Sequence, residues 1–445
     1  MSKTPLLVHL IFHPASDNAH NLALTIHKAL NADPALPGLR LSTVFCPTDG
    51  VLPPADYPLD EAERNFVVVL ADYWVVDGNS GQLRTWSGFI GDLWAACDTS
   101  PNRFFPVQLD ETAWGFDPRL AGTTFLRGFA ERDPAARATL VIRRLVIELC
   151  RYLADEPQGT DEHSKAPVKL FLSHAKVDLD SEPKVFHALE DYLRQDQPVR
   201  AWIDSGNIEA GSAFGERITT GIQDSSVLCV LTDNYSTREW CRKEVLLAKE
   251  HRRPLVVIAA FNSQEVRSFP YLGNVPVFRW PCPAADAGQT AALHRNAAMA
   301  AVDLMLKETL RHLHTRLLLE DDKQDGDILL SRPPELLSVL QAREAGAILY
   351  PDPPLGLEEL NLLGNAVPVP LTTPLARLAS QRPLQGTRIG LTMSESTDIH
   401  RFGLDPLHLG DAMIEISRYL LIKGATLVYG GDLQPADAHR NRLPP

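Results

Sequence analysis

The sequence predicts an α/β protein with two parallel β-sheets in tandem, each carrying helices on both faces. Apolar stretches of strand length alternate with amphipathic stretches of helix length in residues 5–154, and the same plan recurs in residues 167–320. Strands separated by helices pair in parallel, because the chain must cross one face of the sheet before each new strand. A strand, a helix and a second strand also occur in the last sixty residues. We therefore expect two tandem sheets, related by duplication, and a smaller C-terminal segment of the same class.

The first block, residues 1–154, begins with a strand at 6–12 and a helix at 21–31. A polar linker at 154–167 separates it from the second block. The remaining elements expected in the first block are strands at 39–45, 65–71 and 104–110 and a long helix at 136–153.

The second block, residues 167–320, has its core at 167–283 and ends on a long helix from about residue 289. Its expected strands lie at 168–174, 199–204, 227–233, 254–261 and 275–280. An acidic stretch then marks a boundary before a Pro- and Leu-rich segment, 333–385, which has no clear period and is expected to be an ordered connector. Residues 386–445 form the C-terminal segment.

Charge and composition exclude several classes of protein. The net charge of −13 argues against a protein that coats nucleic acid or anionic membranes, because both need clustered Lys and Arg. The apolar runs are too short or too polar to cross a bilayer or to act as a signal sequence. The six cysteines are widely spaced, without the pairs or Cys/His clusters that bind zinc, so no metal site is expected. Free thiols and a cytoplasmic location are the resulting expectations.

The residues that follow the strands of the second block predict a cleft. Ser173 and His174 end its first strand, Asp204 ends the second and Asp233 the third. The carboxyl ends of parallel strands meet at one edge of a sheet, where α/β proteins bind their ligands. Ser236 to Glu239 fits a capping box, so a helix is expected to begin just before Trp240. Glu244 lies four residues after Trp240 and should share its helical face at the same edge.

These residues resemble the TIR domain family, in the form that cleaves NAD+. The resemblance rests on VKLFLSHAKVDLD, on the strand and loop from Val199 and on the pattern T-x-x-W-C-x-x-E that ends at Glu244. It implies a flavodoxin-like fold and a catalytic role for Glu244, whose carboxylate would stabilise the oxocarbenium-like transition state. It also implies a substrate-binding role for residues around the cleft, namely Ser173, His174, Asp204, Gly211, Phe214, Trp240 and Cys241. Trp240 is expected to pack beneath the pocket.

Two other enzyme classes do not fit. Gly206 and Gly211 have the spacing of a phosphate-binding P-loop, but no lysine follows the second glycine. Ser173 and His174 are adjacent, and no G-x-S-x-G sequence is present, so a Ser-His-Asp hydrolase is also disfavoured. The first block has no Glu four residues after Trp86 or Trp94. We interpret it as a degenerate TIR-like domain without catalysis, and an unrelated α/β domain remains the alternative.

The C-terminal segment, residues 386–445, resembles the start of a SLOG domain, a Rossmann-like module that binds nucleotide-derived ligands. The resemblance rests on LTMSES, with Ser394 and Glu395, and on LVYGGDL, with Gly430 and Gly431. Paired glycines after a strand let backbone N–H groups approach a phosphate, although such a pair is often only a turn. A complete module of this kind is longer than this segment, so its sheet is expected to be about half built, and either completed by another chain or non-functional.

The arrangement looks like that of bacterial TIR–SLOG proteins, which are thought to act in defence against phage. It implies an NAD+ glycohydrolase that releases nicotinamide and ADP-ribose or a cyclic isomer, with NAD+ as substrate and no cofactor. Self-association of TIR domains, driven by a nucleotide-derived activator, would complete the site. Two alternatives remain open: a signalling adaptor whose TIR domains only bind other TIR domains, and a nucleotide sensor without turnover.

Overall fold

The structure is a computed structural model that describes most of the chain. It covers residues 3–48, 51–77, 85–98, 101–154, 168–179, 184–195, 199–203, 214–261, 269, 271–281, 287–379, 382–394, 396 and 398–429.

The N-terminal sheet, within these ranges, has five parallel strands in the order β2-β1-β3-β4-β5. The predicted strands are all present, and the two-residue strand β5 is an addition that the sequence analysis did not foresee. The strands are β1 (Leu7–Ile11), β2 (Thr43–Phe45), β3 (Asn65–Ala71), β4 (Arg103–Gln108) and β5 (Leu126–Arg127).

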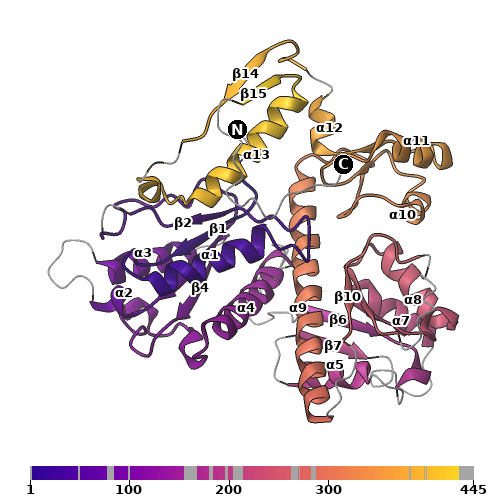
Figure 1. Cartoon of the computed structure of the whole chain (residues 1–445), viewed down its shortest axis with the longest axis horizontal. Coiled ribbons are helices and arrows are strands. Elements are labelled where there is room, and N and C mark those ends of the chain that lie inside the picture. The colour runs from indigo at the N-terminus through magenta and orange to yellow at the C-terminus, as the bar shows by residue number, and fades with distance from the viewer. Residues whose placement is uncertain are drawn as a thin grey trace.

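Helices cover both faces of this sheet (Figure 1). The side chains of β3 alternate between two hydrophobic clusters: Phe66, Val68 and Leu70 belong to one, and Val67 and Val69 to the other. A central parallel strand is buried on both faces, which explains its unbroken apolar sequence. α1 and α4 contribute to the first cluster, and α2 and α3 to the second. The helices are α1 (Asp17–Asn31), α2 (Tyr73–Asp77), α3 (Trp86–Asp98) and α4 (Pro134–Ala154).

The second sheet repeats this topology. Its described strands are all parallel and follow the order β10-β9-β8-β6-β7, which corresponds strand for strand to the order of the N-terminal sheet. Both sheets therefore have the flavodoxin-like order 2-1-3-4-5. The prediction of an α/β protein with tandem flavodoxin-like folds is confirmed. The strands are β6 (Val168–Ser173), β7 (Val199–Ile203), β8 (Ser226–Leu231), β9 (Leu255–Ala259) and β10 (Val277–Arg279).

The start of one helix in this region differs from the prediction. α8 begins at Glu239, as expected, but Arg238 occupies the N-cap position and no side chain caps the helix. The predicted capping box from Ser236 to Glu239 is therefore wrong. Tyr235–Thr237 instead form a turn of 3₁₀-helix, and the Thr237 hydroxyl donates to the Asn234 carbonyl at 2.7 Å. The helices are α5 (Val185–Arg194), α7 (Phe214–Gln223), α8 (Glu239–Glu250) and α9 (Ala287–Glu320).

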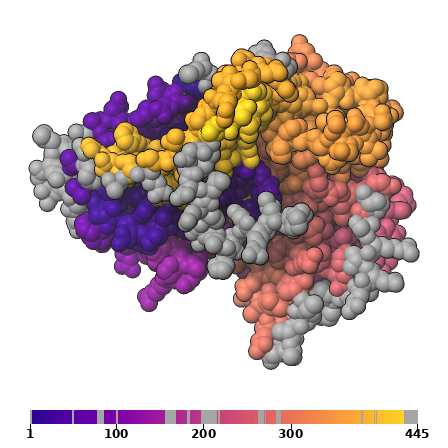
Figure 2. Space-filling model, turned by 45° about the horizontal axis from the view of Figure 1, so that its top comes forward, coloured from indigo at the N-terminus to yellow at the C-terminus, as the bar shows by residue number. Residues whose placement is uncertain are grey.

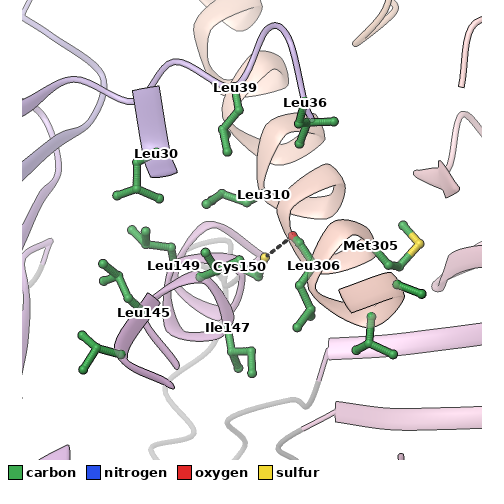
Figure 3. Close-up of a cluster of buried hydrophobic side chains, with 14 of the residues drawn as sticks. Leu30, Leu36, Leu39, Leu145, Ile147, Leu149, Cys150, Met305, Leu306 and Leu310 are labelled. Atoms are coloured by element: carbon green, nitrogen blue, oxygen red, sulfur yellow. Dashed lines mark hydrogen bonds between the residues drawn. The ribbon is translucent and has the colours of Figure 1, made fainter. Parts of the chain in front are cut away.

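The long helix α9 stands between the two sheets (Figure 1). Its 34 residues give a length of about 50 Å at 1.5 Å per residue. α9 packs against α4 of the N-terminal half and against α5, β8 and β9 of the second sheet. Figure 3 shows Leu306 and Leu310 of α9 among Leu145, Leu149 and Cys150 of α4. The Cys150 thiol donates to the Leu306 carbonyl at 3.5 Å. The two sheets thus share one hydrophobic core.

Residues 328–379, most of which were expected to form a connector, build a small parallel sheet of their own. In this continuously described stretch the strand order is β11-β12-β13. A separate hydrophobic cluster that includes Val339, Ile348, Tyr350 and Leu363 fills its interior. The strands and helices are β11 (Ile328–Leu329), α10 (Leu336–Gln341), β12 (Ile348–Leu349), α11 (Leu357–Ala366), β13 (Leu371–Thr372) and α12 (Pro374–Ala379).

The C-terminal segment is a β-α-β unit that lies against the N-terminal domain (Figure 2). The Phe45 N–H at the edge strand β2 donates to the Gly403 carbonyl at 3.0 Å. Gly403 has φ +70°, and a Cβ there would lie 2.1 Å from the Phe45 oxygen, so only glycine fits this contact. The His408 ring packs 4.8 Å from those of Phe45 and His27. The unit comprises β14 (Arg388–Leu391), α13 (Pro406–Ile422) and β15 (Thr426–Tyr429).

Among the described residues, no helix has both the length and the apolar character required to cross a membrane.

An ion pair between α4 and α9 provides a test of the shared core. The Arg143 guanidinium donates to both carboxylate oxygens of Asp303, at 2.5 and 2.8 Å, and both side chains are largely buried. In a double-mutant cycle with Arg143→Ala and Asp303→Ala, we expect a coupling energy of about 1–2 kcal/mol, because the pair is bidentate and shielded from water. Urea unfolding measures it. The exposed pair Lys323–Glu320 is the control, with an expected coupling below about 0.5 kcal/mol; equal couplings would contradict the prediction.

A buried histidine predicts how stability depends on pH. His9 lies between the Tyr57 hydroxyl and Asn65 Oδ1, each 2.8 Å from a ring nitrogen, and burial lowers the pKa of His9 to about 4. Between pH 6.5 and about 4, His9 binds a proton in the unfolded chain but stays neutral in the folded protein. As the pH is lowered through this window, the free energy of unfolding should therefore decrease by up to about 1.4 kcal/mol per pH unit. Above the window this contribution should be constant. Urea unfolding of wild type and His9→Gln measures the difference. Parallel pH profiles for the two proteins would contradict the prediction.

Candidate active site

The second sheet changes direction between β6 and β8. β7 lies on one side of β6, and β9 and β10 lie beyond β8, so the helices that follow β6 and β8 leave towards opposite faces. Such a switch point, at the carboxyl ends of the two strands, is the place where α/β proteins bind ligands. Ser173, the last residue of β6, pairs with Cys229 of β8 at this point. The sheet therefore presents Ser173 at its switch point.

A buried hydrogen-bond chain ends on the candidate catalytic carboxylate. Ser173 Oγ donates to Glu244 Oε2 at 2.5 Å, and the Tyr235 hydroxyl lies 2.6 Å from Ser173 Oγ. Because the Ser173 hydrogen is directed at the carboxylate, Tyr235 donates to Ser173. Glu244 is only 5% exposed, and Ser173 and Tyr235 are fully buried. A carboxylate in this dry environment exerts a stronger field on a nearby cation than it would in water.

The two cysteines around this chain remain thiols. Burial, with a smaller effect of the neighbouring Glu244 charge, raises the pKa of Cys241 to about 12. Burial likewise raises the pKa of Cys229 to about 12. Neither thiol is an ionised nucleophile at neutral pH, since a thiolate is the reactive form. Cys241 instead connects the helix to the strand, because its thiol donates to the His174 carbonyl at 3.5 Å.

His174 and Trp240 are close in sequence to this buried chain: His174 follows Ser173, and Trp240 lies four residues before Glu244. The His174 ring packs on Phe186 of α5, with the ring centroids 4.1 Å apart. Trp240, expected beneath the pocket, lies instead at the surface with 39% of its area exposed. Its ring faces Gly215 at the start of α7, and the Lys243 ammonium lies 4.6 Å from the ring centroid. An exposed aromatic ring offers a flat surface for a ligand.

The structure describes the remaining predicted residues unevenly. The backbone of Phe214 begins α7. Ser394 follows β14 and is exposed. The other predicted residues, Asp204, Gly211, Glu395, Gly430 and Gly431, lie outside the described residues. Among the described residues, no group of three or more His, Cys, Asp or Glu side chains is arranged to hold a metal ion.

Two contacts at this rim were not predicted from the sequence. Tyr235 was overlooked, although a large aromatic residue within the polar turn Asp233 to Thr237 was a signal that it is buried. Asp178, after β6, accepts hydrogen bonds from Thr232 and, at 2.7 Å, from Asn234 after β8. These bonds connect the two loops that follow β6 and β8.

The N-terminal sheet has different residues at the equivalent place. α3 follows β3 as α8 follows β8, and it begins at Trp86. Four residues later, where α8 has Glu244 after Trp240, α3 has Ile90, which is 1% exposed. After β1, the His13 ring stacks on Trp74 with centroids 5.5 Å apart. An apolar side chain thus fills the position that a carboxylate occupies in the second sheet.

Comparison with known proteins gives two family matches. Residues 170–278 match the model of the TIR domain, and residues 383–443 match that of SLOG cluster2. This chain contains a TIR domain and a SLOG segment. Ser173, Tyr235 and Glu244 lie within the TIR match, and the N-terminal sheet lies outside both matches.

Among solved structures, the chain is similar to the TIR domains in the structure of the activated Roq1 resistosome directly recognizing the pathogen effector XopQ. The identity is 19% and the TM-score 0.19, and the match covers 21% of this chain. It spans somewhat more than half of that chain, 57%. No curated protein sequence gives a significant match.

Removal of the Ser173 hydroxyl tests the buried chain in the TIR domain. Ser173→Ala leaves a buried carboxylate without one of its donors, so we expect a loss of about 2–3 kcal/mol in the free energy of unfolding. Ser226→Ala is the matched control, because Ser226 is equally buried and its hydroxyl pairs with the neutral Thr309 hydroxyl at 2.8 Å. For the control we expect about 1 kcal/mol. Urea unfolding measures both, and an equal or smaller loss for Ser173→Ala would contradict the assignment.

Proposed function

We propose that this protein is an NAD+ glycohydrolase whose TIR domain cleaves the bond between nicotinamide and ribose at Glu244. The observation that carries the proposal is the position of the Glu244 carboxylate. It accepts a hydrogen bond from Ser173 at the switch point of a TIR domain, within a site that excludes most water.

The reaction needs few groups from the protein. The nicotinamide of NAD+ is a cationic pyridinium and leaves as a neutral molecule, taking the electron pair of the C1′–N bond, so no general acid is required. Positive charge then develops on the ribose, and a fixed carboxylate stabilises it. Water attacks C1′ and loses a proton, which gives ADP-ribose, whereas attack by a nucleophile within the same molecule gives a cyclic isomer. NAD+ is the substrate in this proposal, and no cofactor takes part.

The burial of Glu244 supports control of this activity by assembly. With 5% of its surface exposed, the carboxylate cannot contact a ribose until the residues around it move. Self-association of TIR domains supplies such a movement in our proposal, and a nucleotide-derived activator bound at the SLOG segment, around Ser394, Glu395, Gly430 and Gly431, drives it. The biological role that we propose is bacterial defence against phage.

The burial of Glu244 also favours a second candidate function. A carboxylate held inside a domain by Ser173 stabilises the fold whether or not it meets a substrate. A TIR domain with such a residue could act as a non-catalytic signalling adaptor that only binds other TIR domains. The replacement of the equivalent position by Ile90 in the N-terminal sheet is consistent with a chain that uses one such fold for contacts alone.

The deciding experiment measures nicotinamide release from NAD+ by the purified full-length protein over a range of concentrations, with and without a crowding agent. We expect release that rises more than linearly with protein concentration. Glu244→Gln keeps an acceptor for Ser173 but removes the charge, so the rate should fall at least about 100-fold. Glu239→Gln is the matched control, because Glu239 lies on the same helix, is solvent-exposed and pairs with Lys243 at 2.7 Å. Its rate should stay within about twofold of wild type.

Two outcomes contradict the proposal, the first its activity and the second its assignment to Glu244. If wild type releases no nicotinamide at any concentration, the adaptor is favoured. If Glu244→Gln and Glu239→Gln are equally active, the chemistry takes place elsewhere. Circular dichroism of both variants shows whether a loss of activity reflects unfolding.

A further inference from the structure

A second cleft lies at the opposite end of the TIR sheet from Glu244. Its walls come from the turn after α8, the start of β9, the α9 helix and residues 330–338 before and within α10. It holds about 540 Å³ of space between protein atoms, including the part that is open to solvent. The described residues that line it are Lys249, Arg252, Arg253, Leu255, Asn274, Val275, Glu308, Leu330, Ser331, Arg332, Pro333, Glu335 and Ser338.

The acidic residues of this cleft are already engaged. Glu308, 1% exposed, binds Arg332 through two hydrogen bonds of 3.0 and 2.5 Å. The same carboxylate binds Arg311 through two more, at 2.7 and 2.8 Å. Glu335 pairs with Lys249. One carboxylate is thus shared by two guanidinium groups, and positive charge remains in excess.

Three further arginines add to this excess. Within the described part of the chain, no carboxylate lies within ion-pair distance of Arg252, Arg253 or Arg316. Arg253 Nε donates to the Ser225 carbonyl at 3.0 Å, which leaves the end of its guanidinium for another acceptor. Burial lowers the pKa of Arg252 and of Arg253, and the charge of Arg316 lowers both further, whereas the charge of Asp224 raises the pKa of Arg253. Asp224 therefore balances part of the charge of Arg253, while Arg252 and Arg316 add to the positive charge at the cleft.

The pKa of a buried histidine, His312, is also affected by the positive charge around this cleft. His312 lies inside α9 beside the cleft, and its ring is 2.7 Å from Ser331 Oγ. Burial lowers the pKa of His312 far below its ordinary value, and four arginines around it, Arg311, Arg253, Arg316 and Arg332, lower it further. The surroundings of this cleft therefore disfavour any additional cation.

One of these arginines, Arg252, has an unfavourable left-handed backbone conformation. Arg252 has φ +51° and is the one non-glycine residue with positive φ in the described ranges. It follows the last turn of α8, where the Arg252 N–H donates to Lys249 O at 3.0 Å and the Arg253 N–H to Ala248 O at 2.8 Å. Glycine is the usual residue at this point of such a helix end, because a side chain strains the left-handed conformation. Strain of this kind is concentrated at functional positions.

We propose that this cleft binds a phosphate-bearing small molecule. Its diphosphate group is held by Arg252 and Arg253 of the lining, and Arg316, exposed on α9 outside the lining, adds its charge. Guanidinium groups bind phosphate oxygens through paired, charge-assisted hydrogen bonds, and a diphosphate carries enough charge to satisfy several of them. Leu255, Val275 and Leu330 give the cleft an apolar wall for the rest of the ligand. This site is separate from the one proposed for NAD+ cleavage. Lys249 and Glu244 lie five residues apart on α8, about 7.5 Å along the helix, so a bound anion would fix the helix that carries Glu244.

The test uses the full-length protein and inorganic pyrophosphate as the probe. Thermal unfolding is followed as pyrophosphate is added, with potassium chloride at matched ionic strength as the reference. We expect a melting temperature that rises and then saturates with pyrophosphate, and no such rise with chloride. The readout is independent of NAD+ cleavage, so failure of this proposal and failure of the enzymatic proposal are distinguishable.

Two variants and one control locate the effect. Arg252→Gly should melt at or above the temperature of wild type without ligand, because it relieves the strained backbone, yet bind pyrophosphate about tenfold more weakly. Arg316→Gln should weaken binding by a similar factor. Arg295→Gln, also exposed on α9 but 21 residues away and about 30 Å along the helix, should respond as wild type does.

A wild-type protein that responds to pyrophosphate no more than to chloride would overturn the proposal. So would Arg252→Gly and Arg316→Gln variants that respond as strongly as Arg295→Gln. In either case the arginines would only shape the surface around α9.

Discussion

The packing of α9 between two sheets is the contact on which the rest of the molecule depends. Every residue of α9 from 301 to 315 is buried or half-buried, so this part of the helix is covered on all sides. A helix covered in this way requires neighbours on all its faces. α4 of the N-terminal half and the TIR sheet provide them. Because both share one core with α9, their relative position is set by side-chain packing and not by the linker between them.

This shared helix also relates the two ends of the TIR domain. Its apolar part supports the sheet that presents Ser173, while Glu308 lines the second cleft. Arg311 and His312 contact two residues of that lining, Glu308 and Ser331. α8 connects the same two places, with Glu244 in one and Lys249 in the other. Packed elements of this kind move as units, because close-packed interiors do not deform gradually. In our proposal, a ligand bound at the cleft would therefore act on the carboxylate through this one helix.

The sequence predicted those features that depend on local pattern. The strands around Val67 and Cys229 were recognisable because strands buried on both faces are continuously apolar, and the alternation with helices indicated parallel sheets. The strands β5, β11, β12 and β13 were not predicted, because two residues are too few to show the alternation of apolar and polar side chains that identifies a strand. Ser173 and Glu244 were expected at one edge of the sheet, but their direct hydrogen bond was not. The second cleft was unpredictable for another reason: Arg252, Glu308 and Arg332 line it together only because the fold brings distant segments together.

The two sheets differ in few side chains between the proposed active site and its counterpart in the N-terminal sheet. Both have the strand order 2-1-3-4-5, and in both a helix with a tryptophan near its start follows the third strand. The difference lies in single side chains: Glu244 with Ser173 in one sheet, and Ile90 with its apolar neighbours in the other. Function resides in such sites and not in the fold that carries them. The N-terminal sheet holds Gly403 of the C-terminal unit at its edge, through the Phe45 N–H. The β2 edge thus positions the SLOG segment by a backbone contact that needs no particular side chain at Phe45.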